Sequence, residues 1–138
     1  MASRYSEKEK NDRKKWSNKY SSLKKRGKVE FNSPQELKKW YESKNKCEYC
    51  GLTEDVRRRI HKIAEERGAG RMDLRGKPLE IDRFNPKKPY GEKNCRLACY
   101  WCNNAKTDFF DGKEFEPIGK AIGKALRSII KKRKIARL

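Results

Sequence analysis

The chain has 138 residues, of which 41% are charged and 34% hydrophobic, and its formal net charge at pH 7 is +19. This length is typical of one domain, and the excess of lysine and arginine points to a polyanionic partner, most simply nucleic acid. No apolar stretch approaches the roughly 18 residues that a membrane span requires, and the N-terminus lacks a signal-peptide core. We therefore expect an intracellular, cytoplasmic protein with no membrane partner.

The N-terminal region is polar and basic. Residues 1–12 carry short polar and charged side chains, so we expect a mobile basic tail there. In residues 13–26, Trp16, Tyr20 and Leu23 recur at helical spacing among basic residues. This pattern fits a helix that lies on a phosphate backbone, and it fits an ordinary amphipathic helix equally well. Both interpretations stay open.

A second helix has an explicit start signal. Ser33 can cap its N-terminus, Pro34 suits the first helical position, and Glu36 completes a capping box. Leu37, Trp40 and Tyr41 then share one face, which we expect to enter the core.

A third helix is predicted after Thr53, with Gly68 ending it. Its apolar positions are predicted to face inward, and its basic residues to form an outer face. The inward set is Val56, Ile60 and Ile63, and the outward set is Arg57, Arg58, Arg59 and Lys62.

The C-terminal half predicts two strands and two helices. Residues 79–84, LEIDRF, alternate apolar and polar side chains as a half-buried strand does, and residues 95–99 form a returning strand. A helix should begin near Cys102. Apolar residues at helical spacing then predict a long amphipathic helix that ends in a basic run: Phe115, Ile118, Ile122, Leu126 and Ile129.

The five cysteines point to a metal site. Cys47 with Cys50, and Cys99 with Cys102, form two CxxC pairs. In a reducing compartment this pattern favours metal thiolates over disulfides, and four sulfurs suit the tetrahedral geometry of zinc. We therefore predict a structural Zn²⁺ site that joins distant parts of the chain. Cys95 alternates with a core position of the strand and is expected to be a small buried residue.

The order strand, loop, strand, helix, with Asp82 near the end of the first strand and Asn103 directly after the second CxxC, resembles the ββα-metal core of HNH nucleases. In that family the corresponding positions are usually Asp-His, a middle Asn, and a final His or Asn. The matching residues here are Asp82-Arg83, Asn94 and Asn103, and Lys106 lies where such cores often place a lysine.

The resemblance implies a catalytic divalent cation. A carboxylate oxygen from Asp82 and an amide oxygen from Asn103 are the hard ligands that Mg²⁺ or Mn²⁺ prefers. Such a cation can bind a scissile phosphate and stabilise charge on the leaving oxygen. Asn94 is expected to brace the loop between the strands and not to touch the metal.

One departure from the family concerns the general base. The usual histidine is Arg83 here, and a guanidinium does not take up a proton in this pH range. The pattern is most similar to a rare-cutting restriction enzyme of the family that carries the same arginine, and in which a loop tyrosine is proposed to begin strand cleavage. The matching residue is Tyr90, whose phenolate Arg83 or the metal would favour. His61, the single histidine, is a rival base.

We therefore predict an α+β protein: a small helix-rich domain around a ββα-metal hairpin–helix core held by a four-cysteine zinc site. The predicted ranges are a tail over 1–12 and one HNH nuclease domain over 13–138, with N-terminal helices in 13–46, the zinc-bound core in 47–110 and the C-terminal helix in 111–138. The expected function is cleavage of double-stranded DNA in a prokaryotic or viral setting, such as restriction or a mobile element.

Two other functions compete with this prediction. A non-catalytic zinc module that binds DNA or RNA would explain the charge and the cysteines, and so would a basic ribosome-associated protein. Neither has a need for Asp82 facing Asn103. A homodimer is expected if both strands are cut symmetrically with one active site per chain.

Overall fold

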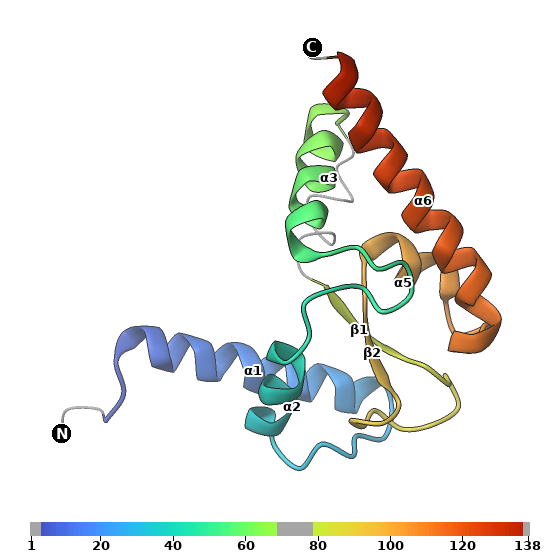
Figure 1. The fold of residues 1–138 in the computed structure, drawn as a ribbon. Helices are drawn as coiled ribbons and strands as arrows, with labels where there is room; N and C mark the ends of the chain where they lie inside the picture. The colour runs from blue at the N-terminus through green and yellow to red at the C-terminus, as the bar shows by residue number, and fades with distance from the viewer. Residues whose placement is uncertain (1–3, 69–78, 137–138) are drawn as a thin grey trace. The chain divides into compact units, whose positions relative to one another are not determined.

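Figure 1 shows the computed structural model of the chain, which describes residues 4–68 and 79–136. Within these ranges the chain forms five helices and a two-stranded sheet, so the predicted α+β class is confirmed. The elements belong to two compact units, which we describe separately. Unit 1 consists of Met1–Lys44 and Lys87–Asn94, and unit 2 of Asn45–Pro86 and Cys95–Leu138. The predicted domain over 13–138 spans both units.

The first element of unit 1 is α1 (Glu7–Arg26), which begins earlier than predicted. Residues 7–12, expected to be part of a mobile tail, form its first turns. The reason is a capping signal: the Ser6 hydroxyl accepts a hydrogen bond from the Glu9 N–H at 3.2 Å. The predicted apolar face is confirmed, because Trp16 and Leu23 are both buried.

The second element, α2 (Pro34–Glu42), starts where the sequence predicts. The Ser33 hydroxyl accepts from the Glu36 N–H at 3.2 Å, while the Glu36 carboxylate accepts from the Asn32 N–H at 2.6 Å. The first bond satisfies an N–H group that a helix start leaves without a partner, and the second ties the preceding residue to the first turn. Leu37 and Trp40 are buried as predicted, whereas Tyr41 on the same face is only partly buried.

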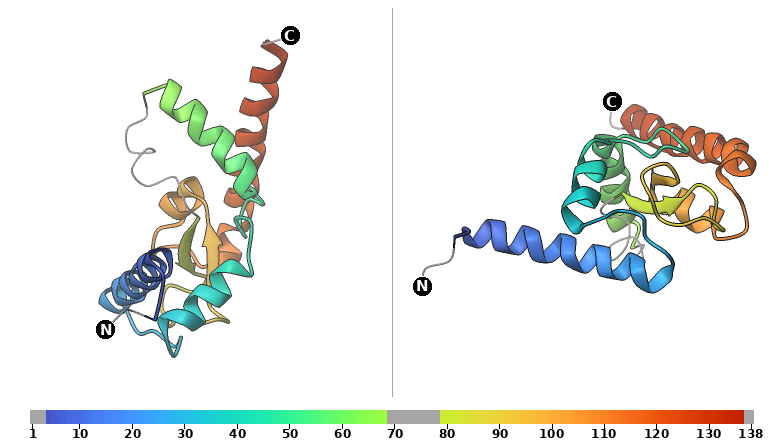
Figure 2. Two further views of the ribbon diagram at one scale, coloured as in Figure 1. Left: turned by 90° about the vertical axis from the view of Figure 1, so that its left-hand side faces the viewer. Right: turned by 90° about the horizontal axis from the view of Figure 1, so that it is seen from below.

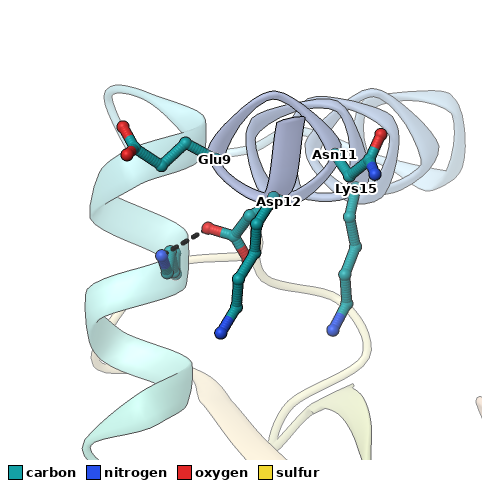
Figure 3. A pocket seen from close by; sticks show the side chains of 6 residues that line it. Glu9, Asn11, Asp12 and Lys15 are labelled. Carbon is teal, nitrogen blue, oxygen red and sulfur yellow. Dashed lines mark hydrogen bonds and ion pairs between the residues drawn. The ribbon is translucent and has the colours of Figure 1, made fainter. Parts of the chain in front are cut away.

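A surface hollow lies between α1 and α2 and is lined by residues of both charge signs (Figure 3). Lys38 bonds the Asp12 carboxylate at 2.5 Å, and this bond holds the pKa of Asp12 below its usual value. Both side chains are partly exposed to solvent, so the pair adds little to stability. Lys8, Lys15 and Lys38 line the hollow together with Glu9 and Asp12, so no single sign of charge dominates it.

Unit 1 also contains the loop that joins the two predicted strands. The Tyr90 N–H donates to the Lys28 carbonyl at 2.8 Å, and the Glu30 N–H donates to the Tyr90 carbonyl at 2.6 Å. Val29 and Tyr90 thus form a parallel bridge. The loop backbone is fixed at Tyr90 by a segment some 60 residues earlier in the chain.

Unit 2 contains the predicted hairpin and helix. β1 (Glu80–Arg83) pairs antiparallel with β2 (Cys95–Ala98), and Ile81 lies opposite Leu97 on the buried face. Cys99 caps α5 (Tyr100–Lys106), which packs against β1. The strand–loop–strand–helix order expected from the sequence is therefore confirmed.

The helix α3 (Glu54–Glu66) has the predicted Thr53 cap and buries Ile60 and Ile63. One prediction about this helix is wrong, because Arg57 is only 6% exposed and does not belong to the outer basic face. The guanidinium reaches back one turn to bind the Glu54 carboxylate, with contacts of 2.6–3.0 Å. This ion pair compensates the burial of the Arg57 charge.

The long helix α6 (Gly112–Ala136) forms as predicted, with Phe115 and Leu126 buried. It lies beside α3, and an ion pair between Glu66 and Arg133 connects the two helices (Figure 1). Across the described ranges, none of the helices combines the length and the apolar character that a membrane crossing demands.

Two glycines let α6 approach the first knuckle, which we define as residues 47–50. A Cβ at Gly119 would come within 2.7 Å of the Tyr49 carbonyl oxygen, and one at Gly123 within 2.6 Å of the Cys50 carbonyl oxygen. Real Cβ atoms essentially never come this close to backbone. The helix can therefore rest directly on the knuckle only because both positions lack a side chain.

We expect Gly123→Ala to destabilise the protein by about 1–3 kcal/mol, the usual cost of overpacking. The sign is informative, because replacing glycine by alanine inside a helix otherwise gains up to about 1 kcal/mol. Thermal unfolding followed by circular dichroism measures the change. Ser128→Ala, on an exposed turn of the same helix, is the control and should be close to neutral. An unchanged or raised melting temperature for Gly123→Ala would contradict the close contact.

Candidate active site and metal centre

The four predicted zinc ligands lie together in unit 2. The sulfur atoms of Cys47, Cys50, Cys99 and Cys102 all lie within 4.8 Å of one another, and all four side chains are buried. The Cys50 and Cys99 sulfurs are 3.7 Å apart. A tetrahedral zinc with bonds of about 2.3 Å places its sulfurs about 3.8 Å apart. The four cysteines are thus positioned to bind a metal ion, consistent with structural zinc.

Local backbone geometry brings the sulfurs to one point. After the first knuckle, Gly51 has a φ of +76°, which favours glycine and lets the chain reverse so that the Cys47 N–H bonds the Leu52 carbonyl at 2.8 Å. At the second pair, Cys99 is the cap of α5, and its sulfur accepts from the Cys102 N–H at 3.5 Å. Cys95 is buried on β2 and lies outside the sulfur group, as predicted.

The electrostatics of the sulfur group call for a cation. Hydrogen bonds from the thiols of Cys102, Cys50 and Cys99 lower the pKa of Cys47. The same group raises the pKa of Cys102, chiefly through Cys47. Four adjacent thiolates would repel one another, so ionisation of all four sulfurs requires a bound positive ion.

Asp82 is held at the junction of three segments. Its Oδ2 atom accepts a 2.6 Å hydrogen bond from the Tyr49 hydroxyl of the first knuckle and lies 3.0 Å from the Lys106 ammonium of α5. Burial raises the pKa of Asp82, against the effect of the bonds from Tyr49 and Lys106. Burial, followed by the charge of Asp82, also raises the pKa of Tyr49. The Tyr49 phenol therefore stays protonated and acts as a donor, not as a nucleophile.

Lys106 is a fully buried charge at this junction. Its side chain has no exposed area, and its ammonium contacts the Asp82 carboxylate and donates to the Arg83 carbonyl at 2.8 Å. The ammonium also lies 5.8 Å from the centre of the Tyr49 ring, within range of a cation–π contact. Buried lysines are rare unless paired, so Asp82 supports the fold as well as any chemistry.

Asn103, the second predicted cation ligand, faces the same strand. Its amide Nδ2 donates to the Glu80 carboxylate, and Glu80 lies two residues before Asp82, on the same side of β1. Asn103 and Lys106 are three residues apart on α5 and so share one helix face. Asp82 and Asn103 therefore both lie at the contact between β1 and α5.

Asp82 and Asn103 each have one side-chain oxygen that accepts no hydrogen bond from the described residues. Both contacts of Asp82 use Oδ2, and the Asn103 contact uses Nδ2. No residue of the described ranges donates a hydrogen bond to Oδ1 of Asp82 or to Oδ1 of Asn103. The pair thus combines fixed orientation with two hard oxygen atoms that remain available to a ligand.

The other predicted site residues lie as follows. Arg83 is next to Asp82 but on the opposite face of β1, with its guanidinium 3.9 Å from the Asp108 carboxylate. Asn94 donates to the carbonyls of Lys88 and Pro89 at 3.3 and 3.0 Å, the loop-bracing position expected of it.

The two candidate bases, Tyr90 and His61, belong to different units. Tyr90 is 5% exposed and belongs to unit 1, whereas Asp82 belongs to unit 2. His61 lies on the buried side of α3, with Nε2 3.1 Å from the Glu65 carboxylate of the same helix. The catalytic roles of Tyr90 and His61 stay predictions.

Comparison with known proteins supports the assignment of the hairpin and helix. The chain is similar to a solved structure of PacI, a rare-cutting HNH restriction endonuclease, with a TM-score of 0.60 and 28% sequence identity over 80% of this chain and 75% of that one. This protein has an HNH-like fold. No family model matches the sequence, and no curated protein matches it significantly.

Sequence reasoning missed Glu80 and Tyr49 as parts of the site. The signal for Glu80 was present, because the alternation that places Asp82 on one strand face places Glu80 there too. Tyr49 gave no such signal. It meets Asp82 across 33 residues of chain, and the contact depends on the sulfur group bringing the two segments together.

Proposed function

We propose that this protein is a metal-dependent endonuclease of the HNH type that hydrolyses phosphodiester bonds in duplex DNA. The observation that carries the proposal is the pair of open oxygens, Oδ1 of Asp82 and Oδ1 of Asn103, at the β1–α5 contact. The likeness to PacI and the net charge of +19 support DNA as the substrate. A restriction or mobile-element role fits a small nuclease of this kind.

In this proposal, Asp82 and Asn103 hold Mg²⁺ or Mn²⁺, and the cation supplies stabilisation of negative charge on the phosphate and on the leaving oxygen. Tyr49 and Lys106 orient Asp82 by holding its other oxygen. Glu80 orients Asn103 by accepting from its amide nitrogen. Such partners fix a ligand before the substrate arrives, which is what precise positioning requires.

The chain must also supply a nucleophile or a base. Arg83 cannot accept a proton, and Tyr49 keeps its own proton because its pKa is raised. Tyr90 is therefore the leading candidate, either attacking phosphorus or deprotonating a water, and His61 is the rival. Since Tyr90 is 5% exposed, its use in catalysis requires that DNA binding give the phenol access to the phosphate.

Incubation of purified protein with a mixed plasmid preparation tests the proposal. Cleavage is expected with Mg²⁺ or Mn²⁺ and not in their absence. Sequencing the cleaved ends reports the target sequence, the number of strands cut and the end polarity. If zinc-loaded, folded protein binds DNA but cuts none in either metal, the nuclease proposal is wrong. The burial of Tyr90 favours a second candidate function, that of a zinc-containing nucleic-acid-binding protein.

The Glu80–Asn103 bond leads to a specific expectation. Glu80→Ala removes the acceptor and should raise the Mn²⁺ concentration needed for half-maximal cleavage by about 10–100-fold, the usual cost of losing a group that orients a metal ligand. The rate at saturating Mn²⁺ should change far less. Glu116→Ala is the matched control, because Glu116 is an exposed carboxylate on α6 that pairs with Lys120. Equal Mn²⁺ requirements for wild type and Glu80→Ala would show that Glu80 does not orient the metal ligand.

Tyr90→Phe keeps the ring and removes the hydroxyl, so it separates packing from chemistry. If the phenol begins cleavage, the cleavage rate should fall by at least about 100-fold, the lower range of general acid–base effects. DNA affinity and melting temperature should stay near wild-type values. His61→Gln, in the same assay, is expected to retain cleavage. Full activity of Tyr90→Phe would exclude the Tyr90 hydroxyl from the cleavage step and leave His61 as the candidate base.

A further inference from the structure

The outward face of α6 carries a straight row of basic side chains. Their spacings of seven, four, three and four residues keep them within about 60° of one another around a helix of 3.6 residues per turn. All are exposed, and they lie opposite the buried side of α6 that holds Phe115 and Leu126. We call this set the α6 row: Lys113, Lys120, Lys124, Arg127 and Lys131. It extends about 27 Å, at 1.5 Å per residue.

The α6 row has an excess of positive charge that acidic neighbours do not neutralise. Lys120 pairs with Glu116 at 3.0 Å. Within the part of the chain that the structure describes, Lys113, Lys124 and Lys131 form no ion pair. The contrast is α3, where Arg58 lies 3.7 Å from Glu54 and Arg59 lies 3.5 Å from Asp55.

The helix that carries the α6 row is held against the first knuckle by close contacts. Arg127 donates to the Cys50 carbonyl at 3.2 Å, and the glycine contacts described above press the same helix onto the first knuckle. In Figures 1 and 2, α6 runs along one edge of unit 2, and the other elements of that unit lie on one side of the helix. The row therefore presents a fixed line of charges in the same unit as Asp82 and Asn103.

We propose that the α6 row is a contact surface for the phosphate backbone of duplex DNA, separate from the β1–α5 site and independent of base sequence. This inference rests on the proposed function for the identity of the polyanion. A linear row of fixed cations suits a partner whose charges also lie in a line, and duplex DNA carries one negative charge for each ~1.7 Å of its axis. A membrane surface fits poorly, because an interfacial helix needs an outward apolar face, and α6 turns Phe115 and Leu126 inward.

The test compares two triple variants that lose the same charge. The row variant is Lys113→Gln/Lys124→Gln/Lys131→Gln, which spares Arg127 because of its contact with Cys50. The control is Arg58→Gln/Arg59→Gln/Lys62→Gln on α3. Affinity for a 24-base-pair duplex of mixed sequence is measured by fluorescence anisotropy from about 50 to 200 mM salt. No Mg²⁺ or Mn²⁺ is added, so that binding is observed without cleavage.

The slope of log affinity against log salt is negative, and each lost phosphate contact reduces its magnitude by about 0.9. The magnitude should therefore fall by roughly 2.7 in the row variant and by less than about 1 in the control. The loss should be the same for duplexes of different sequence. Equal slopes for the row variant and wild type would overturn the inference. So would loss of binding to polyglutamate or to phosphatidylserine vesicles with DNA binding unchanged, because the row would then serve another partner.

The nuclease proposal and this inference fail in different ways. If the row variant shows the reduced slope while wild-type protein cuts no DNA with Mg²⁺ or Mn²⁺, the α6 surface stands and the nuclease proposal falls. If wild type cuts DNA and the row variant keeps the wild-type slope, the nuclease proposal stands and the α6 surface falls. Circular dichroism of both triple variants checks that they are folded, as expected for exposed side chains.

Discussion

Asp82→Ala is expected to abolish cleavage and also to destabilise the fold, while Asp82→Ala/Lys106→Met should abolish cleavage with a smaller loss of stability. The single variant leaves the Lys106 ammonium buried without its carboxylate, and breaking such a pair costs about 3–5 kcal/mol. Replacing both partners by apolar groups is often close to neutral. The predicted order of melting temperature is wild type, then the double variant, then the single variant.

The effect on cleavage has a separate cause. If Asp82 holds the catalytic cation as proposed, loss of its carboxylate should cost about 4 kcal/mol of transition-state stabilisation, or roughly a thousand-fold in rate. Single-turnover cleavage, measured well below the melting temperature of each variant, separates this effect from unfolding. Lys106→Met alone is informative, because it leaves Asp82 in place without its buried partner. Appreciable cleavage by the folded double variant would exclude Asp82 as a metal ligand.

Cys99→Ala is expected to eliminate the bound metal and unfold unit 2. Structural zinc contributes about 10–16 kcal/mol in small zinc-binding domains, which matches or exceeds the total stability of a typical domain, about 5–15 kcal/mol. Metal analysis should find one zinc per chain in wild type and none in the variant. Circular dichroism should show a large loss of helical signal, and prolonged treatment of wild type with a strong chelator should reproduce it.

Cys95→Ala is the matched control for the zinc prediction. Cys95 is as buried as the four ligands but lies outside the sulfur group. This variant should keep one zinc and lose only about 1 kcal/mol of stability, the cost of a small change in packing. A folded Cys99→Ala protein with a full complement of zinc would contradict the four-cysteine site.

Features controlled by residues close together in the chain were predictable from the sequence. Ser33 and Pro34 marked the start of α2, and Leu79 with Ile81 marked a strand. The repeated CxxC correctly predicted that four sulfurs lie together in a position to bind a metal ion, because that grouping depends on the spacing within each pair. The early start of α1 was also predictable, since Ser6 and Glu9 form the same kind of cap. The charged composition of residues 1–12 led instead to the prediction of a mobile tail.

Features that depend on contacts between distant segments could not be predicted. The burial of Arg57 required knowledge of which side of α3 faces the protein. The contact between Tyr49 and Asp82, and the pairing of Tyr90 with residues 28–30, join parts of the chain whose proximity no local pattern encodes. The resemblance to HNH nucleases supplied Asp82 and Asn103 as candidates, and the structure added the neighbours that orient them.

If Asp82 binds a cation as proposed, its two contacts within the protein have a consequence for ion selectivity. Since Tyr49 and Lys106 occupy Oδ2, the carboxylate can offer a cation a single oxygen. Calcium takes six to eight oxygens and often binds carboxylates through both atoms, whereas magnesium prefers an octahedron with few protein ligands and several waters. A site built from one carboxylate oxygen and one amide oxygen should therefore discriminate in favour of the smaller ion and leave most of its coordination sphere to water and phosphate.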